Sequence, residues 1–289
     1  MPDWASINQN LREAGIPLEP TATARPVGGG DISAAWQLDT GNDGVFLKTG
    51  PVAAIDMFAA EAEGLAEIAL ANALRVPEVL AIGKTSDTAF LALEWLPFER
   101  PGKACEKRLG QRLADMHRTT SDRFGWHRDN TIGLTPQHNR WSTDWVAFFR
   151  ERRLGYQLKL ATTNGYTGQL QEQGLRLLER LPSLFENYRP LPSLLHGDLW
   201  GGNWASSGGE PVIFDPAVYY GDRETDLAMT RLFGGFGHAF YEAYEAAWPL
   251  EPGSARRQAL YQLYHVLNHL NLFGGGYQGR ALALMGSII

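Results

Sequence analysis

The amino-acid sequence predicts an α+β protein with two unequal lobes. A small N-terminal lobe is expected to hold an antiparallel sheet with one main helix, and a larger C-terminal lobe is expected to be mostly helical. Residues 20–96 consist mainly of short strand-like segments, whereas the apolar residues beyond Pro97 recur with helical spacing. Because proline interrupts regular structure, we place the lobes at residues 1–96 and 97–289.

The small lobe is predicted to contain four strands with definite bounds, and a further probable strand precedes the glycine-rich turn at residues 28–33. Residues 34–38 and 45–48 are separated by a run of turn formers at residues 39–44, which is typical of a hairpin. Residues 78–83 and 89–95 are the other two strand candidates. These four segments are enough for a small sheet.

One helix is expected between the two pairs of strands, at residues 56–72. Phe58, Leu65 and Ile68 recur there near helical spacing, so one face of the helix should be buried. Asp56 stands at the start of the segment, where an acidic side chain is expected to cap the helix.

The larger lobe is predicted to be a set of helices with brief strands between them. The expected helices are residues 103–119, 143–160, 168–188, 223–233, 236–248 and 255–272. Short strands are expected at residues 193–195 and 211–214. Residues 122–140 contain scattered glycine and proline, which predicts an irregular loop that is either functional or simply long.

The composition is that of a globular protein with a sizeable core, with 44% hydrophobic and 20% charged residues. The net charge of −6 and the lack of a long basic block argue against nucleic acid or an anionic membrane as a partner. Cys105 is the only cysteine, which excludes an internal disulfide and a cysteine metal cage. We see no signal peptide and no apolar run of about 20 residues, so we expect a cytoplasmic protein.

The most informative motif is His-Gly-Asp-Leu-Trp-Gly-Gly-Asn at residues 196–203, followed by a strand that ends at Asp215. Asp198 precedes Asn203 by five residues, which matches the spacing of these residue types in the catalytic loop of protein kinases. Asp198 is the candidate base for an attacking hydroxyl. Asn203 and Asp215 offer the oxygen ligands that Mg²⁺ prefers. This pattern predicts phosphoryl transfer from ATP.

The small lobe offers residues for the other half of a nucleotide site. Gly28, Gly29 and Gly30 form a glycine-rich turn that would admit phosphates, although by itself this turn favours a flexible hairpin. Lys48 ends a predicted strand, where its ammonium group is expected to reach the α- and β-phosphates. Glu61 lies on the inward face of the following helix and is the expected partner of Lys48.

Glu63 is the alternative partner, but helical spacing turns it away from the apolar face. At the lobe junction, Glu94, Trp95 and Leu96 are expected to bind the adenine edge through their backbone; a plain linker is the alternative. These three residues complete the predicted nucleotide site.

Two further residues are expected to support the catalytic loop. His196 is expected to orient the loop by hydrogen bonding without titrating. Asp226 either holds the loop backbone or interacts with a helix dipole, and the sequence favours the two roles about equally.

The sequence resembles the fructosamine kinase (ketosamine-3-kinase) family, which is related to aminoglycoside phosphotransferases and choline kinases within the protein-kinase-like fold. The resemblance spans nearly the whole chain and is carried by the 196–203 motif, with tryptophan at its fifth position. Further matches are residues 28–33, 58–61, 215–217, 220–222, 233–236 and 261–274.

The resemblance implies that ATP, with Mg²⁺, phosphorylates the O3 hydroxyl of a ketoamine such as a fructosamine or ribulosamine. The 3-phosphate eliminates readily, so the implied role is deglycation of an amine or a protein. The expected partner is therefore a small ketoamine or a glycated amine or protein, and the expected state is a monomer or weak dimer. For the sugar and its protonated amine, the candidate contacts are Trp200, Tyr220 and Asp222.

His269 also lies in a segment that the resemblance places near the acceptor. It follows His265 by four residues on a predicted helix, a spacing that would suit a metal, but no third ligand is evident. Core packing or pocket lining is therefore favoured for this pair. A substrate role is kept open for His269.

Two alternative functions remain. The same base and metal ligands would serve a phosphotransferase for another small alcohol of the aminoglycoside, choline or homoserine type. A pseudokinase-like binding module is the other alternative, although Lys48, Asp198, Asn203 and Asp215 are all present. Neither the ketose nor the amine portion of the substrate follows from the sequence.

Overall fold

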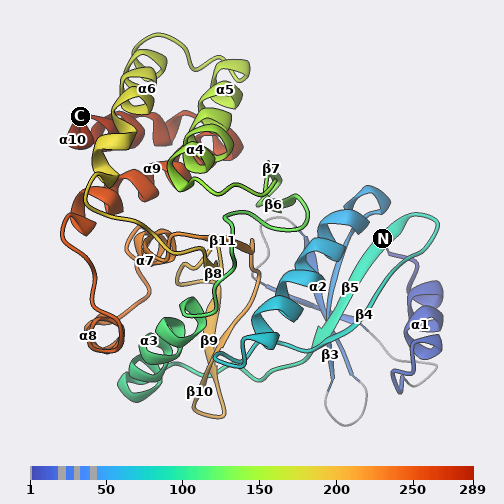
Figure 1. Cartoon of the computed structure of the whole chain (residues 1–289). Coiled ribbons are helices and arrows are strands. Elements are labelled where there is room, and N and C mark those ends of the chain that lie inside the picture. The colour runs from blue at the N-terminus through green and yellow to red at the C-terminus, as the bar shows by residue number, and fades with distance from the viewer. Residues whose placement is uncertain (1, 19–23, 29–32, 40–43) are drawn as a thin grey trace.

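The computed structural model describes residues 2–18, 24–28, 33–39 and 44–289, and it has two lobes (Figure 1). The smaller lobe contains a five-stranded sheet in the order β1-β2-β3-β5-β4, and all neighbouring strands are antiparallel. Its strands are β1 Ala24–Val27, β2 Ala34–Leu38, β3 Val45–Pro51, β4 Val79–Lys84 and β5 Thr88–Glu94. The predicted hairpin and the two later strands are confirmed, and β1 is the strand that was expected, without bounds, before the glycine-rich turn.

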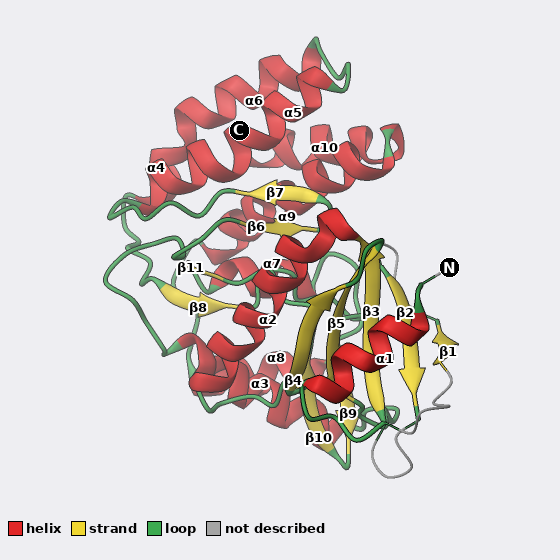
Figure 2. Cartoon of the chain, turned by 90° about the vertical axis from the view of Figure 1, so that its right-hand side faces the viewer, coloured by secondary structure: helices red, strands yellow, loops and turns green. Residues whose placement is uncertain are grey.

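A helix covers each face of this sheet, α1 (Trp4–Glu13) on one side and α2 (Ile55–Leu70) on the other (Figure 2). Successive residues of the interior strand β5 explain why both faces need cover. Phe90 packs in one apolar cluster with Ile7 of α1, while Leu91 packs in another cluster with Phe58 of α2. The period of two along a strand therefore gives the lobe two separate small cores.

The sequence analysis missed α1 and misassigned Asp56. Asp3 caps α1 by accepting a hydrogen bond from the Ser6 backbone N–H, and Ile7 and Leu11 lie on one buried face. These are recognisable helix signals. Asp56 is not the cap of α2, because a short 3₁₀ helix precedes it and Ala54 occupies the cap position. Asp56 lies in the first turn instead.

The larger lobe contains eight α-helices among the described residues (Figure 1). They are α3 Lys103–His117, α4 Trp145–Phe149, α5 Tyr156–Thr163, α6 Gln169–Arg180, α7 Glu224–Thr230, α8 His238–Ala247, α9 Ser254–Phe273 and α10 Gln278–Ile288. The helix predicted at 143–160 is divided by a π-helical turn at Arg150–Gly155, and α10 was not predicted. No helix in the described part of the chain has the length and apolar character to span a bilayer.

Three two-stranded ribbons hold the loops of the larger lobe. β8 (Ser193–Leu195) pairs with β11 (Tyr219–Gly221), and β9 (Trp204–Ser207) pairs with β10 (Glu210–Ile213). The segment 122–140, predicted to be irregular, contains the hairpin of β6 (Asn130–Ile132) and β7 (Thr135–Gln137). The 196–203 motif is thus the loop between β8 and β9, with β10 and β11 on either side of Asp215.

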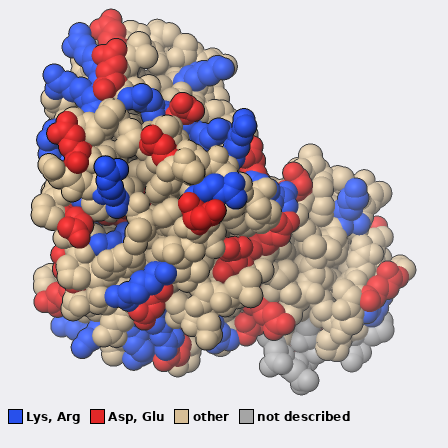
Figure 3. All heavy atoms as spheres, in the orientation of Figure 1, with Lys and Arg blue, Asp and Glu red and all other residues tan. Residues whose placement is uncertain are grey.

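Polar contacts fasten α2 to the larger lobe. Arg128 lies 2.5 Å from a carboxylate oxygen of Glu63 and 3.0 Å from one of Asp56, and the Tyr220 hydroxyl donates to Glu67 over 2.7 Å. On the face seen in Figure 3, acidic and basic side chains are interspersed over the larger lobe. The contacts of α2 fix the helix that carries Glu61 relative to the catalytic motif.

Helices α3 and α8 approach so closely at Gly110 that a side chain there has no room. A Cβ atom at this position would lie 2.2 Å from the Phe240 carbonyl oxygen. We expect Gly110→Ala to lower the free energy of unfolding by about 3 kcal/mol, because the obstructing atoms belong to the backbone of α8.

Gly286→Ala in α10 is the matched control for this prediction, since a Cβ atom there meets nothing within 4 Å. It should be neutral or raise stability by up to about 1 kcal/mol, owing to the better helix propensity of alanine. Thermal and denaturant unfolding of both variants measures the difference. Equal stability of the two variants would contradict the packing argument.

Candidate active site

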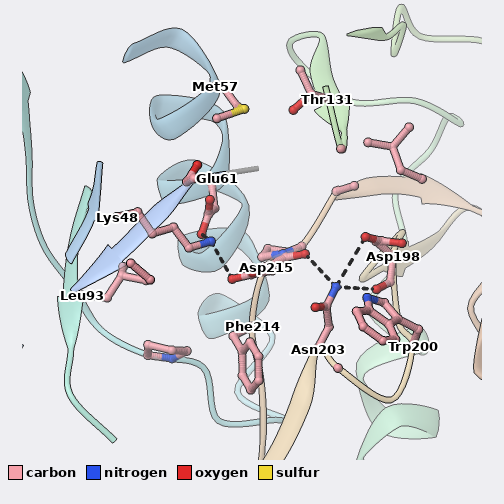
Figure 4. A pocket seen from close by; sticks show the side chains of 18 of the residues that line it. Lys48, Met57, Glu61, Leu93, Thr131, Asp198, Trp200, Asn203, Phe214 and Asp215 are labelled. Carbon is pink, nitrogen blue, oxygen red and sulfur yellow. Dashed lines mark hydrogen bonds and ion pairs between the residues drawn. The ribbon is translucent and has the colours of Figure 1, made fainter. Parts of the chain in front are cut away.

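A cavity of about 730 Å³ lies between the lobes and collects most of the residues that the sequence singled out (Figure 4). Both lobes contribute to its wall. The predicted residues on it are Gly28, Lys48, Glu61, Glu94, Trp95, Leu96, Asp198, Trp200, Asn203, Asp215 and His269. Gly29 and Gly30 lie outside the described residues.

Lys48 links three elements at the centre of this cavity. Its Nζ lies 2.7 Å from Glu61 Oε1 on α2 and 2.6 Å from Asp215 Oδ1 after β10. Burial by itself would lower the pKa of Lys48, but the two carboxylates outweigh it and raise this pKa, so the ammonium group stays charged. Glu63 instead bonds His127 and Arg128 on the outer face of α2, as the helix spacing predicted.

Asp215 has an unusual backbone conformation, with φ at +58°. Side chains other than glycine seldom adopt this left-handed region, although aspartate is among those that tolerate it best. The residue stands between the end of β10 and Pro216. This turn directs its carboxylate toward Lys48 while its carbonyl oxygen faces Asn203 Nδ2 over 3.5 Å.

Asp198 and Asn203 face each other across the catalytic loop (Figure 4). Asn203 Nδ2 donates to the Asp198 carbonyl oxygen over 2.9 Å and approaches its carboxylate at 3.4 Å. Burial, with Asp215 and Asp226 nearby, raises the pKa of Asp198 to about 7. A base whose pKa lies near neutrality suits proton removal from a hydroxyl.

Asp226, at the start of α7, ties down the beginning of this loop. Its two carboxylate oxygens accept hydrogen bonds from the backbone N–H groups of His196, over 2.8 Å, and Gly197, over 2.9 Å. His117 also lies 3.2 Å from Asp226 through Nε2. Although burial opposes it, hydrogen bonding from His117 holds the pKa of Asp226 below its usual value. Of the two predicted roles of Asp226, these hydrogen bonds favour the one in which it holds the loop backbone. The carboxylate also lies in the first turn of a helix.

His196 supports the loop from within. Its Nε2 bonds the Phe214 carbonyl oxygen over 2.9 Å, and its Nδ1 accepts from the Asp198 backbone N–H over 3.3 Å. Burial lowers the pKa of His196, so the ring is neutral at physiological pH. Gly197 beside it has φ at +82°, and a Cβ atom there would lie 2.1 Å from the Ala217 carbonyl oxygen. Only glycine fits between the loop and the strand that follows Asp215.

The oxygen atoms available here suit a hard divalent cation. The side-chain hydrogen bonds that Asn203 makes to described residues all use Nδ2, which leaves Oδ1 for a ligand. Asp215 binds Lys48 through Oδ1, and its side chain is 42% exposed. An amide oxygen and a carboxylate with open positions fit Mg²⁺ that is completed by phosphate oxygens.

The part of the cavity where a nucleotide is predicted to bind has an aromatic contact that was not predicted. Phe98, just beyond the lobe junction, stacks on Phe214 with ring centroids 5.0 Å apart, and both rings line the cavity. The Glu94 side chain is engaged by Arg75 at 2.7 Å, which is consistent with a backbone role for this residue. Flat apolar walls of this kind suit a purine.

Tyr220 and Asp222, predicted as substrate contacts, do not belong to the cavity wall. Tyr220 directs its hydroxyl to Glu67 on α2. Asp222 is fully buried and accepts hydrogen bonds from Tyr188 and Tyr261. Tyr220 in β11 and Asp222 just after it both make packing contacts, so their closeness in sequence to Asp215 does not bring them to the site.

His269 lines the cavity, whereas His265 is buried and does not line it. The His265 carbonyl oxygen accepts a hydrogen bond from Nδ1 of the His269 ring over 2.8 Å. In the described part of the chain, no group of three or more histidine, cysteine or acidic residues is arranged to hold a metal. Thr131, Phe233, Phe273 and Tyr277 are among the wall residues on this side that were not predicted. Apolar periodicity gives no signal for residues at loop tips and helix ends.

Comparisons with known proteins agree with this geometry. A sequence model of the family described as fructosamine kinase matches residues 3–289. A "probable ketoamine kinase" of Synechocystis is 45% identical over 98% of this chain and 95% of its own length. A chloroplastic protein-ribulosamine 3-kinase of Arabidopsis thaliana is 42% identical over 90% of this chain and 80% of its own.

Solved structures show the same fold. A Haemophilus somnus protein, provisionally assigned as a fructosamine-3-kinase, is 30% identical and superposes with a TM-score of 0.90 over 99% of this chain and 97% of its own. An aminoglycoside phosphotransferase at 16% identity has a TM-score of 0.66, with 98% of each chain covered. The α+β, protein-kinase-like fold predicted from the sequence is thereby confirmed.

Replacing Asp226 should slow turnover by more than the accompanying loss of stability can account for. We expect Asp226→Asn to lower the free energy of unfolding by about 2 kcal/mol, because the amide cannot accept all the hydrogen bonds that the carboxylate accepts. The displaced loop should also slow phosphoryl transfer by about 100-fold.

Asp222→Asn is the matched control, because Asp222 is as deeply buried but bonds tyrosine hydroxyls away from the loop. It should lose stability while keeping its turnover within about 3-fold of the unmodified chain. Unfolding and steady-state kinetics, measured side by side, separate the two effects. A similar loss of turnover in both variants would mean that Asp226 has no particular role in the loop.

Proposed function

This chain belongs to the fructosamine kinase family, and we propose that it transfers the γ-phosphoryl group of ATP to the O3 hydroxyl of a ketoamine. Relatives named ketoamine kinase and ribulosamine 3-kinase, at 45% and 42% identity, support the acceptor class. One structural observation carries the chemistry. Lys48 of the sheet and Asp198, Asn203 and Asp215 of the larger lobe meet in a single cavity between the lobes.

Each residue is assigned a role by its position. Lys48, held by Glu61, places a fixed positive charge where the α- and β-phosphates of ATP are expected. Asp198 accepts the proton of the O3 hydroxyl while that oxygen forms a bond to the γ-phosphorus and the bond from this phosphorus to the bridging oxygen of ADP breaks. The raised pKa of Asp198 makes its carboxylate a stronger base than an exposed aspartate.

Asn203 and Asp215 are the residues that would hold Mg²⁺. The ion, when bound, would neutralise negative charge on the β- and γ-phosphates. Glycine at position 28, which lines the cavity, leaves the backbone free to approach phosphates. Glu94, Trp95 and Leu96 are assigned to the adenine edge, with Phe98 and Phe214 beside it.

The proposed product is a ketoamine 3-phosphate, which eliminates phosphate and releases the amine. We therefore infer a role in the repair of glycated amines or proteins. We further propose that the protein acts in the cytoplasm as a monomer or weak dimer. The alternative acceptors are other small alcohols, because aminoglycoside phosphotransferases share the fold. Fold alone does not select an acceptor.

A substrate panel tests this function. Ribulosamine, fructosamine, choline and kanamycin are each incubated with the chain, ATP and Mg²⁺, and ADP release is followed together with the mass of the product. We expect turnover of one or both ketoamines. Turnover of choline or kanamycin alone would favour a phosphotransferase for another small alcohol over a ketoamine kinase. Binding of ATP without any turnover would favour a pseudokinase.

Asp198→Asn should separate nucleotide binding from chemistry. The amide cannot accept the proton, so we expect turnover to fall about 100-fold or more. The ATP dissociation constant should stay within about 3-fold, because Asp198 is not among the phosphate-anchoring residues. If the variant turned over at the rate of the unmodified chain, Asp198 would not be the base.

Asp215→Ala should weaken ATP binding in a magnesium-dependent manner. Titrations with ATP at saturating Mg²⁺ and in the presence of a chelator measure the two affinities. We expect a loss of about 10-fold or more with Mg²⁺ and a smaller change without it, because the variant lacks a cation ligand. Equal losses under both conditions would argue against Asp215 as a metal ligand.

A further inference from the structure

Four aromatic rings form one end of the cavity, and no role has been assigned to them as a group. We call Phe233, His269, Phe273 and Tyr277 the aromatic wall; all four line the cavity. His269 lies at its centre, with its ring centroid 4.7 Å from Phe233, 5.4 Å from Phe273 and 5.2 Å from Tyr277. The rings come from the loop after α7, the end of α9 and the turn before α10.

The aromatic wall is attached to the catalytic loop. The loop that carries Phe233 continues through Gly234 and Gly235, and a Cβ atom on Gly201 would lie 2.8 Å from the Gly235 Cα atom. The Trp204 indole N–H also donates to the Gly235 carbonyl oxygen over 3.1 Å. The wall therefore stands on the side of the cavity where Asp198 and Trp200 lie, away from the nucleotide contacts of the sheet.

The exposure of these rings indicates a ligand. Phe233 is 38% exposed, Phe273 is 57% exposed, and Trp200 beside Asp198 is 37% exposed. Every exposed phenylalanine or tryptophan in the described part of the chain lines this cavity, with Phe98 on the nucleotide side. Apolar surface that is gathered in a concave site is typical of ligand contact.

The charged side chain behind the wall is positive. Arg280 lies behind it, with its guanidinium carbon 5.8 Å from the centroid of the Phe233 ring. Burial lowers the pKa of His269, and Arg280 lowers it further, so the imidazole is neutral at physiological pH. None of the four rings carries charge, and a further cation would meet the field of Arg280.

We propose that the aromatic wall receives the substituent that the amine contributes to the ketoamine, and that it selects uncharged apolar substituents over those that end in a charge. The inference rests on the proposed function. In a ketoamine the nitrogen is attached to C1, two carbons from the O3 hydroxyl that faces Asp198. A substituent on that nitrogen therefore extends away from the reacting atoms on the acceptor side of the cavity, which is where the aromatic wall lies.

The test uses two ribulosamines that share the sugar and a four-carbon chain on the amine. One is made from butylamine and the other from 1,4-diaminobutane, whose far end carries an ammonium group. We expect kcat/KM to be about 10-fold or more higher for the butylamine product, as apolar pockets discriminate by this order. Phe233→Ala and Phe273→Ala should each reduce that preference several-fold by lowering kcat/KM for the butylamine product.

Two comparisons keep this test independent of folding defects. Each variant is measured with both substrates, so general damage lowers both values and leaves their ratio unchanged. Leu175→Ala, an exposed apolar position on α6 outside the cavity wall, is the control variant and should keep the original ratio.

The outcomes separate the two levels of the proposal. Three results would overturn the role of the wall and leave the proposed ketoamine kinase activity intact. They are equal kcat/KM for the two ribulosamines, a preference for the diaminobutane product, and an unchanged ratio in both phenylalanine variants. Failure to phosphorylate any ketoamine would overturn the proposed function itself.

Discussion

The position of one ammonium group governs the active site of this protein. Lys48 extends from the sheet and meets Glu61 of the helix beside it and Asp215 of the other lobe, at 2.7 and 2.6 Å. Lys48 and Glu61 are both buried, and removing either one leaves a charge without compensation, at a cost of about 3–5 kcal/mol. The sheet, α2 and the turn at Asp215 are therefore held in one arrangement.

The outer face of α2 reinforces this arrangement. Arg128 bonds Glu63 and Asp56, and Tyr220 bonds Glu67, so α2 is fastened to the larger lobe on the side opposite the sheet. Each surface pair contributes little by itself. Together they help to hold Glu61 near Lys48. The chain has Pro216 and Ala217 where the Asp-Phe-Gly sequence of protein kinases has phenylalanine and glycine.

Much of the fold was predictable because periodicity reports on local structure. The hairpin of β2 and β3, the strands β4, β5 and β8, and the cores of most long helices follow from spacing alone. The misses are short or lie at interruptions. α1 was overlooked despite a capping aspartate, α10 follows a glycine-rich turn, and the helix at 143–160 is divided by a π-helical turn whose Arg153 is buried against Phe148 and Tyr219.

The sequence by itself determined the chemistry, because Asp198, Asn203 and Asp215 must occur at set intervals on one loop and strand, and such intervals are visible along a chain. It also selected Glu61 over Glu63, since helical spacing decides which side chain faces inward. Tertiary structure alone decided which distant residues join them. Tyr220 and Asp222 are near Asp215 in sequence yet turn into packing contacts, while Phe273 and Tyr277 reach the cavity from the far end of the chain. The physical reason is that local spacing sets the elements, whereas packing between elements sets the direction in which each side chain points.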